Sequence, residues 1–144
     1  MKQSSFLLFT LFLVCAIGCS RGPVCYVVEG TVTFRGEPLT NAAVSFIPVN
    51  PDHGTFFANG MTDENGRFML TAAQFGVPDR GTTAGDYLVT ITRKRDEPSR
   101  FEQSSLGPVP VFESLIPERY SMQDTSGIQV TVERKRNTFT FDLE

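Results

Sequence analysis

His53, the single histidine, is the first residue whose chemistry could be catalytic. It follows Asp52 in a loop flanked by Gly and Pro. Imidazole and carboxylate groups bind zinc and other transition metals, but such a site would need further ligands from elsewhere in the chain. We therefore expect His53 to be a surface residue of the loop, and we expect no resident metal or cofactor.

The segment Asp63-Glu64-Asn65-Gly66 offers side-chain oxygens at a spacing that a calcium loop also uses. In an EF-hand loop the twelfth residue is a Glu that binds the ion through both carboxylate oxygens, whereas Gln74 occupies that position here. Asp63 can instead accept hydrogen bonds from nearby backbone amides, and Gly66 can adopt a positive φ. The segment therefore predicts a hairpin turn.

Nucleophilic hydrolysis needs a Ser or Cys within reach of a general base. The sequence has no Gly-x-Ser-x-Gly motif, and His53 is the sole imidazole available as a base. A hydrolase of unknown substrate is therefore the weakest of three interpretations, and we expect no catalytic residues.

Cys19 stands where acyl transfer could modify its thiolate. It follows Lys2, an apolar run over residues 6–17, and Gly18, an order typical of a signal peptide. A transmembrane helix needs about 20 apolar residues to cross a bilayer, and this run is shorter. The tetrad Ala-Ile-Gly-Cys resembles a bacterial lipobox, with Ala16 in place of the usual Leu. The resemblance implies a diacylglycerol on Cys19 and cleavage before it; the alternative is an ordinary signal peptide with an incidental cysteine.

Acylation of Cys19 would anchor the mature chain to membrane lipid without a spanning segment. Each buried methylene contributes about 0.8 kcal/mol, and more than one acyl chain gives stable anchoring. Bacterial lipoproteins retained at the inner membrane commonly have Asp after the lipidated cysteine, whereas Ser20 follows here. We therefore expect a protein anchored in the cell envelope, at the outer membrane, on its periplasmic or surface face.

Charge and cysteine content narrow the remaining partners. The net charge is -3, so no broad basic face favours nucleic acid. Cys15 would leave with the signal peptide and Cys19 would be acylated. Cys25 would then stand alone in an oxidising compartment, without an internal disulfide partner. We expect a small buried hydrophobe there, with an intermolecular thiol role as the alternative.

From Cys25 onward, short alternating apolar and polar runs are separated by Gly, Asn, Asp and Pro, which is typical of an all-β chain. Gly30 predicts a bulge in the first strand. Segment 74–85 is predicted to be irregular. Segment 93–114 mixes charge with three prolines, which favours a surface excursion over a strand of the sandwich interior. Pro117 predicts a short helix, held against the core by Leu115, Ile116 and Tyr120.

Seven strands are predicted, over residues 26–34, 42–49, 56–62, 67–70, 86–94, 128–134 and 138–143. Their alternating apolar side chains are predicted to face inward, namely Val28, Val32, Phe34, Val44, Phe46, Phe68, Leu70, Tyr87, Val89, Ile91, Ile128, Val130, Val132, Phe139, Phe141 and Leu143.

These strands predict an antiparallel Greek-key β-sandwich. The segments VEGTVTFRGEPLTNAAVSFIP, GMTDENGRFML, AGDYLVTIT, LIPERY and TSGIQVTVERKRNTFTFDL together resemble small bacterial lipoproteins with a transthyretin-like, or carboxypeptidase regulatory-like, domain. The resemblance covers nearly all of residues 28–143 and implies a prealbumin-like sandwich, usually without catalytic residues. Two turns depart from the family pattern: LTNA replaces Leu-Pro-Gly-Ala, and Ala84 replaces Pro.

Two sets of side chains could form a binding surface. Phenylalanines outside the clean alternation could stack on sugars, and basic clusters at residues 93–95 and 134–136 could contact acidic polymers. We expect the aromatic residues to fill the core and the cations to solvate strand ends. The aromatic residues are Phe56, Phe57, Phe75, Phe101 and Phe112.

The sequence thus divides into a signal peptide over residues 1–18, a lipid-anchored tether over 19–24, and one β-sandwich domain over 25–144. The interpretation it favours is a non-catalytic structural or interaction module of the cell envelope, with an envelope protein or a polysaccharide as partner. A carbohydrate-binding module is the first alternative.

Overall fold

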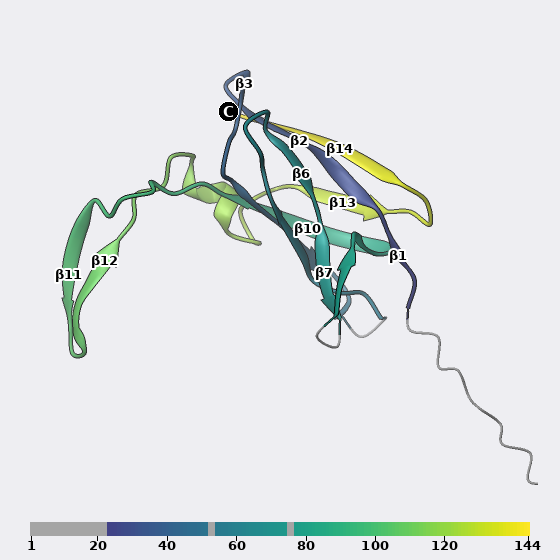
Figure 1. Ribbon diagram of the computed structural model, residues 1–144, viewed down its shortest axis with the longest axis horizontal. Coiled ribbons are helices and arrows are strands. Elements are labelled where there is room, and N and C mark those ends of the chain that lie inside the picture. Colours follow the sequence, from purple (N-terminus) through teal and green to yellow (C-terminus); the bar gives the residue numbers. More distant parts are fainter. Residues whose placement is uncertain (1–22, 52–53, 75–76) are drawn as a thin grey trace, which may run out of the picture.

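The computed structural model describes residues 23–51, 54–74 and 77–144 (Figure 1). Over these ranges the chain is all-β, as predicted, with one 3-10 turn, η2 (Glu118–Ser121). The strands are β1 (Cys25–Tyr26), β2 (Val28–Phe34), β3 (Glu37–Pro38), β4 (Ala43–Pro48), β5 (Ala58–Met61), β6 (Arg67–Met69), β7 (Thr71–Gln74), β8 (Val77–Arg80), β9 (Thr82–Thr83), β10 (Gly85–Thr92), β11 (Arg100–Ser104), β12 (Gly107–Val111), β13 (Gln129–Val132) and β14 (Asn137–Leu143).

Two larger sheets form the body of the domain. The six-stranded sheet has the order β13-β10-β4-β5-β7-β8 and is antiparallel throughout. In the four-stranded sheet β14 lies on one side of β2, while β3 and β6 pair with the other side. Two short ladders, β1-β9 and β11-β12, and an isolated bridge between Lys94 and Ser114 complete the described pairings.

The pairing of β2 with β14 is parallel, so the prediction of a wholly antiparallel arrangement is wrong at this pair. Its register runs without interruption from Asn137 opposite Val28 to Leu143 opposite Phe34. The turn at residues 133–136 carries the chain from β13, in the six-stranded sheet, to β14, in the other sheet. Since β14 does not fold back on β13, its direction is set by docking beside β2.

The hydrophobic core lies between the two larger sheets, where alternating side chains of both meet. The ring of Phe46 on β4 lies 5.7 Å from that of Phe139 on β14 and 6.5 Å from that of Phe68 on β6, centroid to centroid. Complete burial of an aliphatic or aromatic side chain contributes about 1.5–3 kcal/mol. The inward positions predicted from alternation are confirmed as buried for Val28, Val32, Val44, Phe46, Phe68, Leu70, Tyr87, Val89, Ile91, Val132, Phe141 and Leu143.

A buried hydroxyl cluster ties the short strands to this core. The Tyr87 hydroxyl is fully buried and donates to the carbonyl of Thr83 at 2.9 Å. It also lies 3.1 Å from Oγ1 of Thr82 and 3.0 Å from Oγ1 of Thr83. The two threonines in turn bond the backbone carbonyl and amide of Phe56. A buried polar group needs such partners, so the cluster fixes β9 and the segment before β5 against β10.

Segment 74–85 is not irregular, contrary to the prediction, because it contains β8 and β9 and the end of β7. Pro78 lies on β8, the last strand of the six-stranded sheet, opposite Ala73. Proline is tolerated on an edge strand because its missing N–H can face away from the ladder. Pairing within the sheet therefore overrides the weak local signal.

Residues 93–114 do lie outside the two core sheets, as predicted, but they form a regular structure. Strands β11 and β12 make a hairpin that projects from the body (Figure 1). We refer to residues 95–113 as the hairpin arm; a backbone bond from the Arg95 amide to the Glu113 carbonyl, 2.9 Å long, closes its base. After the arm, Ile116 and Tyr120 are buried as predicted, whereas Leu115 is exposed.

Gly30 marks a close approach and not the predicted bulge, since the ladder of β2 with β14 is continuous through it. A Cβ atom at Gly30 would lie 2.1 Å from the carbonyl oxygen of Phe139 and 2.8 Å from the ring of Phe68. Glycine at this position therefore lets β2 approach both of its neighbours.

We predict that Gly30→Ala lowers the free energy of unfolding by about 3 kcal/mol, because the added methyl group must displace a backbone carbonyl. Urea unfolding followed by circular dichroism measures this change. Thr31→Ala, one residue along β2 and only partly buried, is the matched control and should cost less than about 1 kcal/mol. Equal costs for the two variants would contradict the account of Gly30.

Candidate functional site

Several of the residues singled out in the sequence, among them Cys19, Ser20, His53 and Phe75, lie outside the described residues. Cys25 is described: it is half-buried on β1, where its backbone pairs with Thr83. The lipid attachment thus stays a prediction, and so does the role of the histidine.

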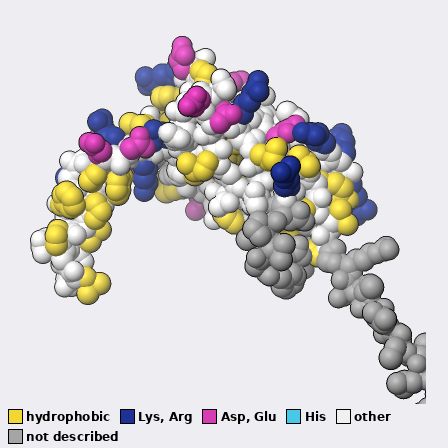
Figure 2. Space-filling model, in the orientation of Figure 1, with side chains coloured by type: hydrophobic (Ala, Val, Ile, Leu, Met, Phe, Trp, Pro, Cys, Tyr) yellow, Lys and Arg dark blue, Asp and Glu magenta, His cyan; other side chains and the backbone are white. Residues whose placement is uncertain are grey.

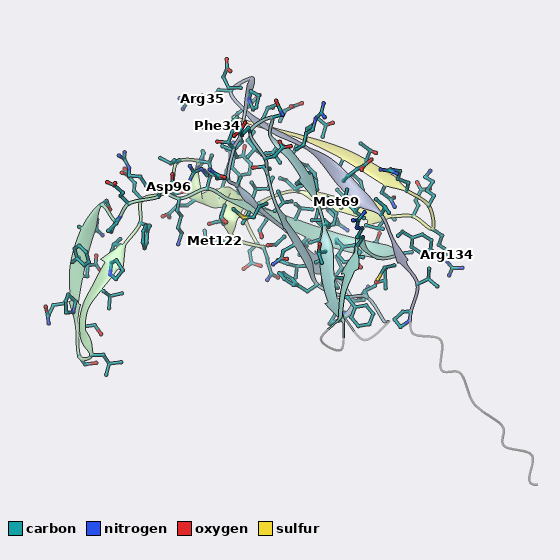
Figure 3. The ribbon with its side chains drawn as sticks, viewed as in Figure 1. Phe34, Arg35, Met69, Asp96, Met122 and Arg134 are labelled. Carbon is teal, nitrogen blue, oxygen red and sulfur yellow. The ribbon has the colours of Figure 1, made fainter. Side chains whose placement is uncertain are left out.

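A shallow groove lies on the outer face of the four-stranded sheet. It has a volume of about 430 Å³. Met69 on β6, which is half-exposed, is one of the residues that line it (Figure 3). The residues around it are Glu29, Gly30, Thr31, Asp63, Arg67, Phe68, Met69 and Thr138. The groove brings three titratable side chains, Glu29, Asp63 and Arg67, around one hollow.

Both carboxylates of the groove are already engaged. Arg136 donates from Nε and Nη2 to the two carboxylate oxygens of Glu29, each at 2.8 Å, and these bonds hold the pKa of Glu29 below its usual value. The Asp63 carboxylate accepts the backbone amides of Arg67 and Asn65 at 2.9 and 2.8 Å, which lowers the pKa of Asp63. Both groups are therefore charged at neutral pH.

This arrangement favours structural roles for the two carboxylates. A general acid needs a raised pKa, and a general base needs free access to the proton it takes. Asp63 caps its own turn, with Gly66 at φ 71°, so the predicted turn is confirmed. The turn is not a hairpin, because the strands on its two sides pair in different sheets: β5 with β4 and β7, and β6 with β2. Among the described residues no three His, Cys, Asp or Glu side chains gather closely enough to hold a metal ion.

The two basic clusters are largely paired with acidic side chains. In the first, Arg93 contacts Asp96 at 3.0 Å and Arg95 contacts Glu113 at 3.4 Å. In the second, which includes Arg134 at the turn between β13 and β14 (Figure 3), Lys135 contacts Glu133 at 2.7 Å. Exposed ion pairs of this kind contribute little to stability, but they leave less net charge for an acidic polymer.

The aromatic residues are divided between the body and the arm. Phe56 packs partly buried against the core, as expected, whereas Phe57 is 51% exposed. Phe101 and Phe112 are 64% and 38% exposed and belong to the hairpin arm, so the expectation that they fill the core is wrong. The core does not cover these two side chains, because the hairpin arm projects from the body.

The hairpin arm is the feature that sequence reasoning missed. Two prolines in β12 argued against a strand, yet β12 pairs with β11 over its full length. Apolar side chains line the arm (Figure 2), and Leu106 at its turn is 97% exposed. The available signal was the absence of charge over residues 103–112.

Comparisons with known proteins give no family for this chain. No family model matches the sequence, and no curated protein matches it. A solved 9R-lipoxygenase from Cyanothece PCC8801 is similar over 83% of this chain, with 16% sequence identity and a TM-score of 0.40. The match spans 16% of the lipoxygenase chain. A similarity at this TM-score carries no argument about fold or function.

The described residues also contain no helix with the length and apolar character that crossing a bilayer requires.

We predict that Asp63→Asn flattens the acid limb of the stability curve. The folded pKa of Asp63 lies below its usual value of 3.8, so its charged form contributes stability above that pH and loses it as the pH falls further. The neutral amide keeps an acceptor oxygen but no charge to titrate. Urea unfolding at a series of pH values from 7 down to about 2 measures the difference.

Glu64→Gln, on the exposed next residue of the same turn, is the matched control, because it replaces a carboxylate of this turn by an amide and keeps the bonds of Asp63 to the amides of Asn65 and Arg67. Its acid limb should stay steeper than that of Asp63→Asn. An acid limb that is equally steep with and without the Asp63 carboxylate would contradict the assignment.

Proposed function

We propose that the chain is a bacterial lipoprotein, acylated at Cys19, whose β-domain is a non-catalytic structural or interaction module of the cell envelope. The observation that carries the proposal is the tetrad Ala-Ile-Gly-Cys at the end of an apolar run that is too short to span a bilayer. The outer membrane is the proposed site, from Ser20 after the lipidated cysteine.

The distance between the proposed lipid and the folded domain supports a role close to the membrane. Strand β1 begins at Cys25, so residues 19–24 form the whole tether. An extended chain spans about 3.3–3.6 Å per residue, which limits the tether to about 20 Å. A domain held this close contacts the membrane and its immediate neighbours.

The architecture supports the finer proposal of a transthyretin-like, seven-stranded Greek-key sandwich. Two sheets share a single core, and the segments that resemble this family supply β2, β4, β10, β13 and β14. A comparison with members of this family has to account for the additional short strands and for the parallel pairing of β2 with β14.

The state of the charged groups supports a non-catalytic role. In the groove, Glu29 is held by Arg136, and Asp63 is held by the amides of its own turn. Each would have to give up these bonds, and regain a higher pKa, before it could donate a proton.

Expression of the full chain in a bacterial host tests the proposal. We expect the protein in the detergent-extractable membrane fraction, with an N-terminal peptide that begins at a diacylglyceryl-modified Cys19 by mass spectrometry. Cys19→Ser should abolish the modification and shift the protein out of that fraction, because the acyl chains on Cys19 are the proposed attachment.

Cys15→Ser is the control, since Cys15 lies in the same apolar run and is not the proposed acceptor. It should leave both the modification and the fractionation unchanged. A mature N-terminus at a residue other than Cys19, or an unmodified Cys19 thiol, would overturn the proposal.

A further inference from the structure

The hairpin arm exposes apolar side chains that the rest of the described domain does not cover. Leu106 is 97% exposed, Phe101 64%, Val109 47% and Phe112 38%. The arm stands away from the body, and apolar side chains follow it to its tip (Figure 2). Clustered apolar exposure of this kind marks a surface that contacts something less polar than water.

The register of the hairpin sorts its side chains onto two faces. Residues directly opposite each other in a ladder share a face, and successive residues alternate between faces. Phe101 lies opposite Pro110, and Gln103 lies opposite Pro108, so one face has no charge. The other face carries Arg100 and Glu102, which form an ion pair at 2.8 Å, together with Val109 and Val111.

Charge is also graded along the length of the arm. Residues 103–112 contain no charged side chain, whereas the base holds Arg95, Asp96, Glu97 and Glu113. The tip is therefore uncharged, with Leu106 exposed at its turn, and the base is ionic. This gradient matches the change in polarity from the aqueous phase to the acyl-chain boundary of a bilayer.

The prolines of β12 limit how a partner could bind. Proline has no N–H, so the outer edge of β12 offers no backbone donor at Pro108 or Pro110. An added β-strand would find few donors there, which leaves the side chains as the contacting groups. Fixed φ angles at both prolines also reduce the entropy that the arm loses when it is held in place.

The positions of the arm and of the start of β1 favour a bilayer as the occupant. In the view down the shortest axis, the tip of the arm and the start of β1 both extend toward the lower side of the molecule (Figure 1). The tether limits the proposed lipid of Cys19 to about 20 Å from Cys25, so a bilayer that holds this lipid can meet the side of the molecule toward which the start of β1 and the tip of the arm extend. The membrane is therefore within reach of the arm.

We propose that the tip of the hairpin arm, centred on Leu106, inserts its apolar side chains into the interfacial layer of the bilayer to which the chain is anchored. The inference rests on the proposed acylation of Cys19 for the side that the arm faces. Insertion stops in the interface, about 5–10 Å deep. The unpaired backbone groups at the edges of a two-stranded hairpin are too costly to place in hydrocarbon.

Tryptophan fluorescence tests the proposal, because the chain has no Trp of its own. Full-length chains with Leu106→Trp or Glu64→Trp are produced with Cys19 and, separately, with Cys19→Ser. They are reconstituted with phosphatidylethanolamine and phosphatidylglycerol vesicles that contain brominated acyl chains. Glu64 is the control site, since its turn packs beside Pro38 and Leu39, near β3 at the opposite end of the domain (Figure 1).

We expect bromine to quench Trp at position 106 several-fold more than Trp at position 64, with a blue shift on vesicle binding. The Cys19→Ser chains should show the same selectivity at a higher lipid concentration, because the arm then binds without the anchor. Phe101→Trp, on the uncharged face, should be quenched more than Glu102→Trp, on the charged face.

Equal quenching at positions 106 and 64 in vesicle-bound protein would overturn the inference and leave the acylation proposal standing. A concentration-dependent blue shift at position 106 without vesicles would overturn it in favour of contact with a second copy. A third outcome separates the two proposals. If Trp at position 106 is quenched selectively in the Cys19→Ser chains, and the Cys19 chains bind the vesicles no more strongly than the Cys19→Ser chains, the proposed lipidation is overturned and the inference stands.

Discussion

The packing of aromatic rings around Phe46 is the interaction on which the rest of the domain depends. Its ring contacts Phe139 and Phe141, from β14, at centroid distances of 5.7 and 6.3 Å, and Tyr87, from β10, at 5.9 Å. Ring pairs at such separations contribute about 0.5–1.5 kcal/mol beyond burial itself. Because these rings belong to both larger sheets, their packing fixes the distance between the sheets and thereby the outer face on which the groove lies.

Much of the core could be predicted from the sequence, because alternation reports which side of a strand faces inward. Val44 with Phe46, and Tyr87 with Ile91, were placed on buried faces and lie there. The turn at Asp63 could also be predicted, since its hydrogen bonds join residues within four positions of each other. Both signals are local in the chain.

What escaped prediction depends on contacts that are distant in sequence. The ion pair of Glu29 with Arg136 joins residues 107 positions apart, and it exists only because β14 runs parallel to β2. In the arm, Pro108 and Pro110 argued against a strand, yet a two-stranded ladder leaves each strand with a free edge where proline does no harm. Local patterns contain neither of these facts, so the groove and the arm needed the structure.

The segment from β6 to β7 changes sheets at Leu70: Arg67–Met69 pairs with β2, and Thr71–Gln74 pairs with β5 and β8. One continuous stretch of backbone therefore forms strand pairings in both sheets. Separating the layers would have to break hydrogen bonds on each side of a fully buried leucine at the same time. The body should accordingly unfold in one cooperative step, so that neither sheet persists alone as a partly unfolded, aggregation-prone intermediate.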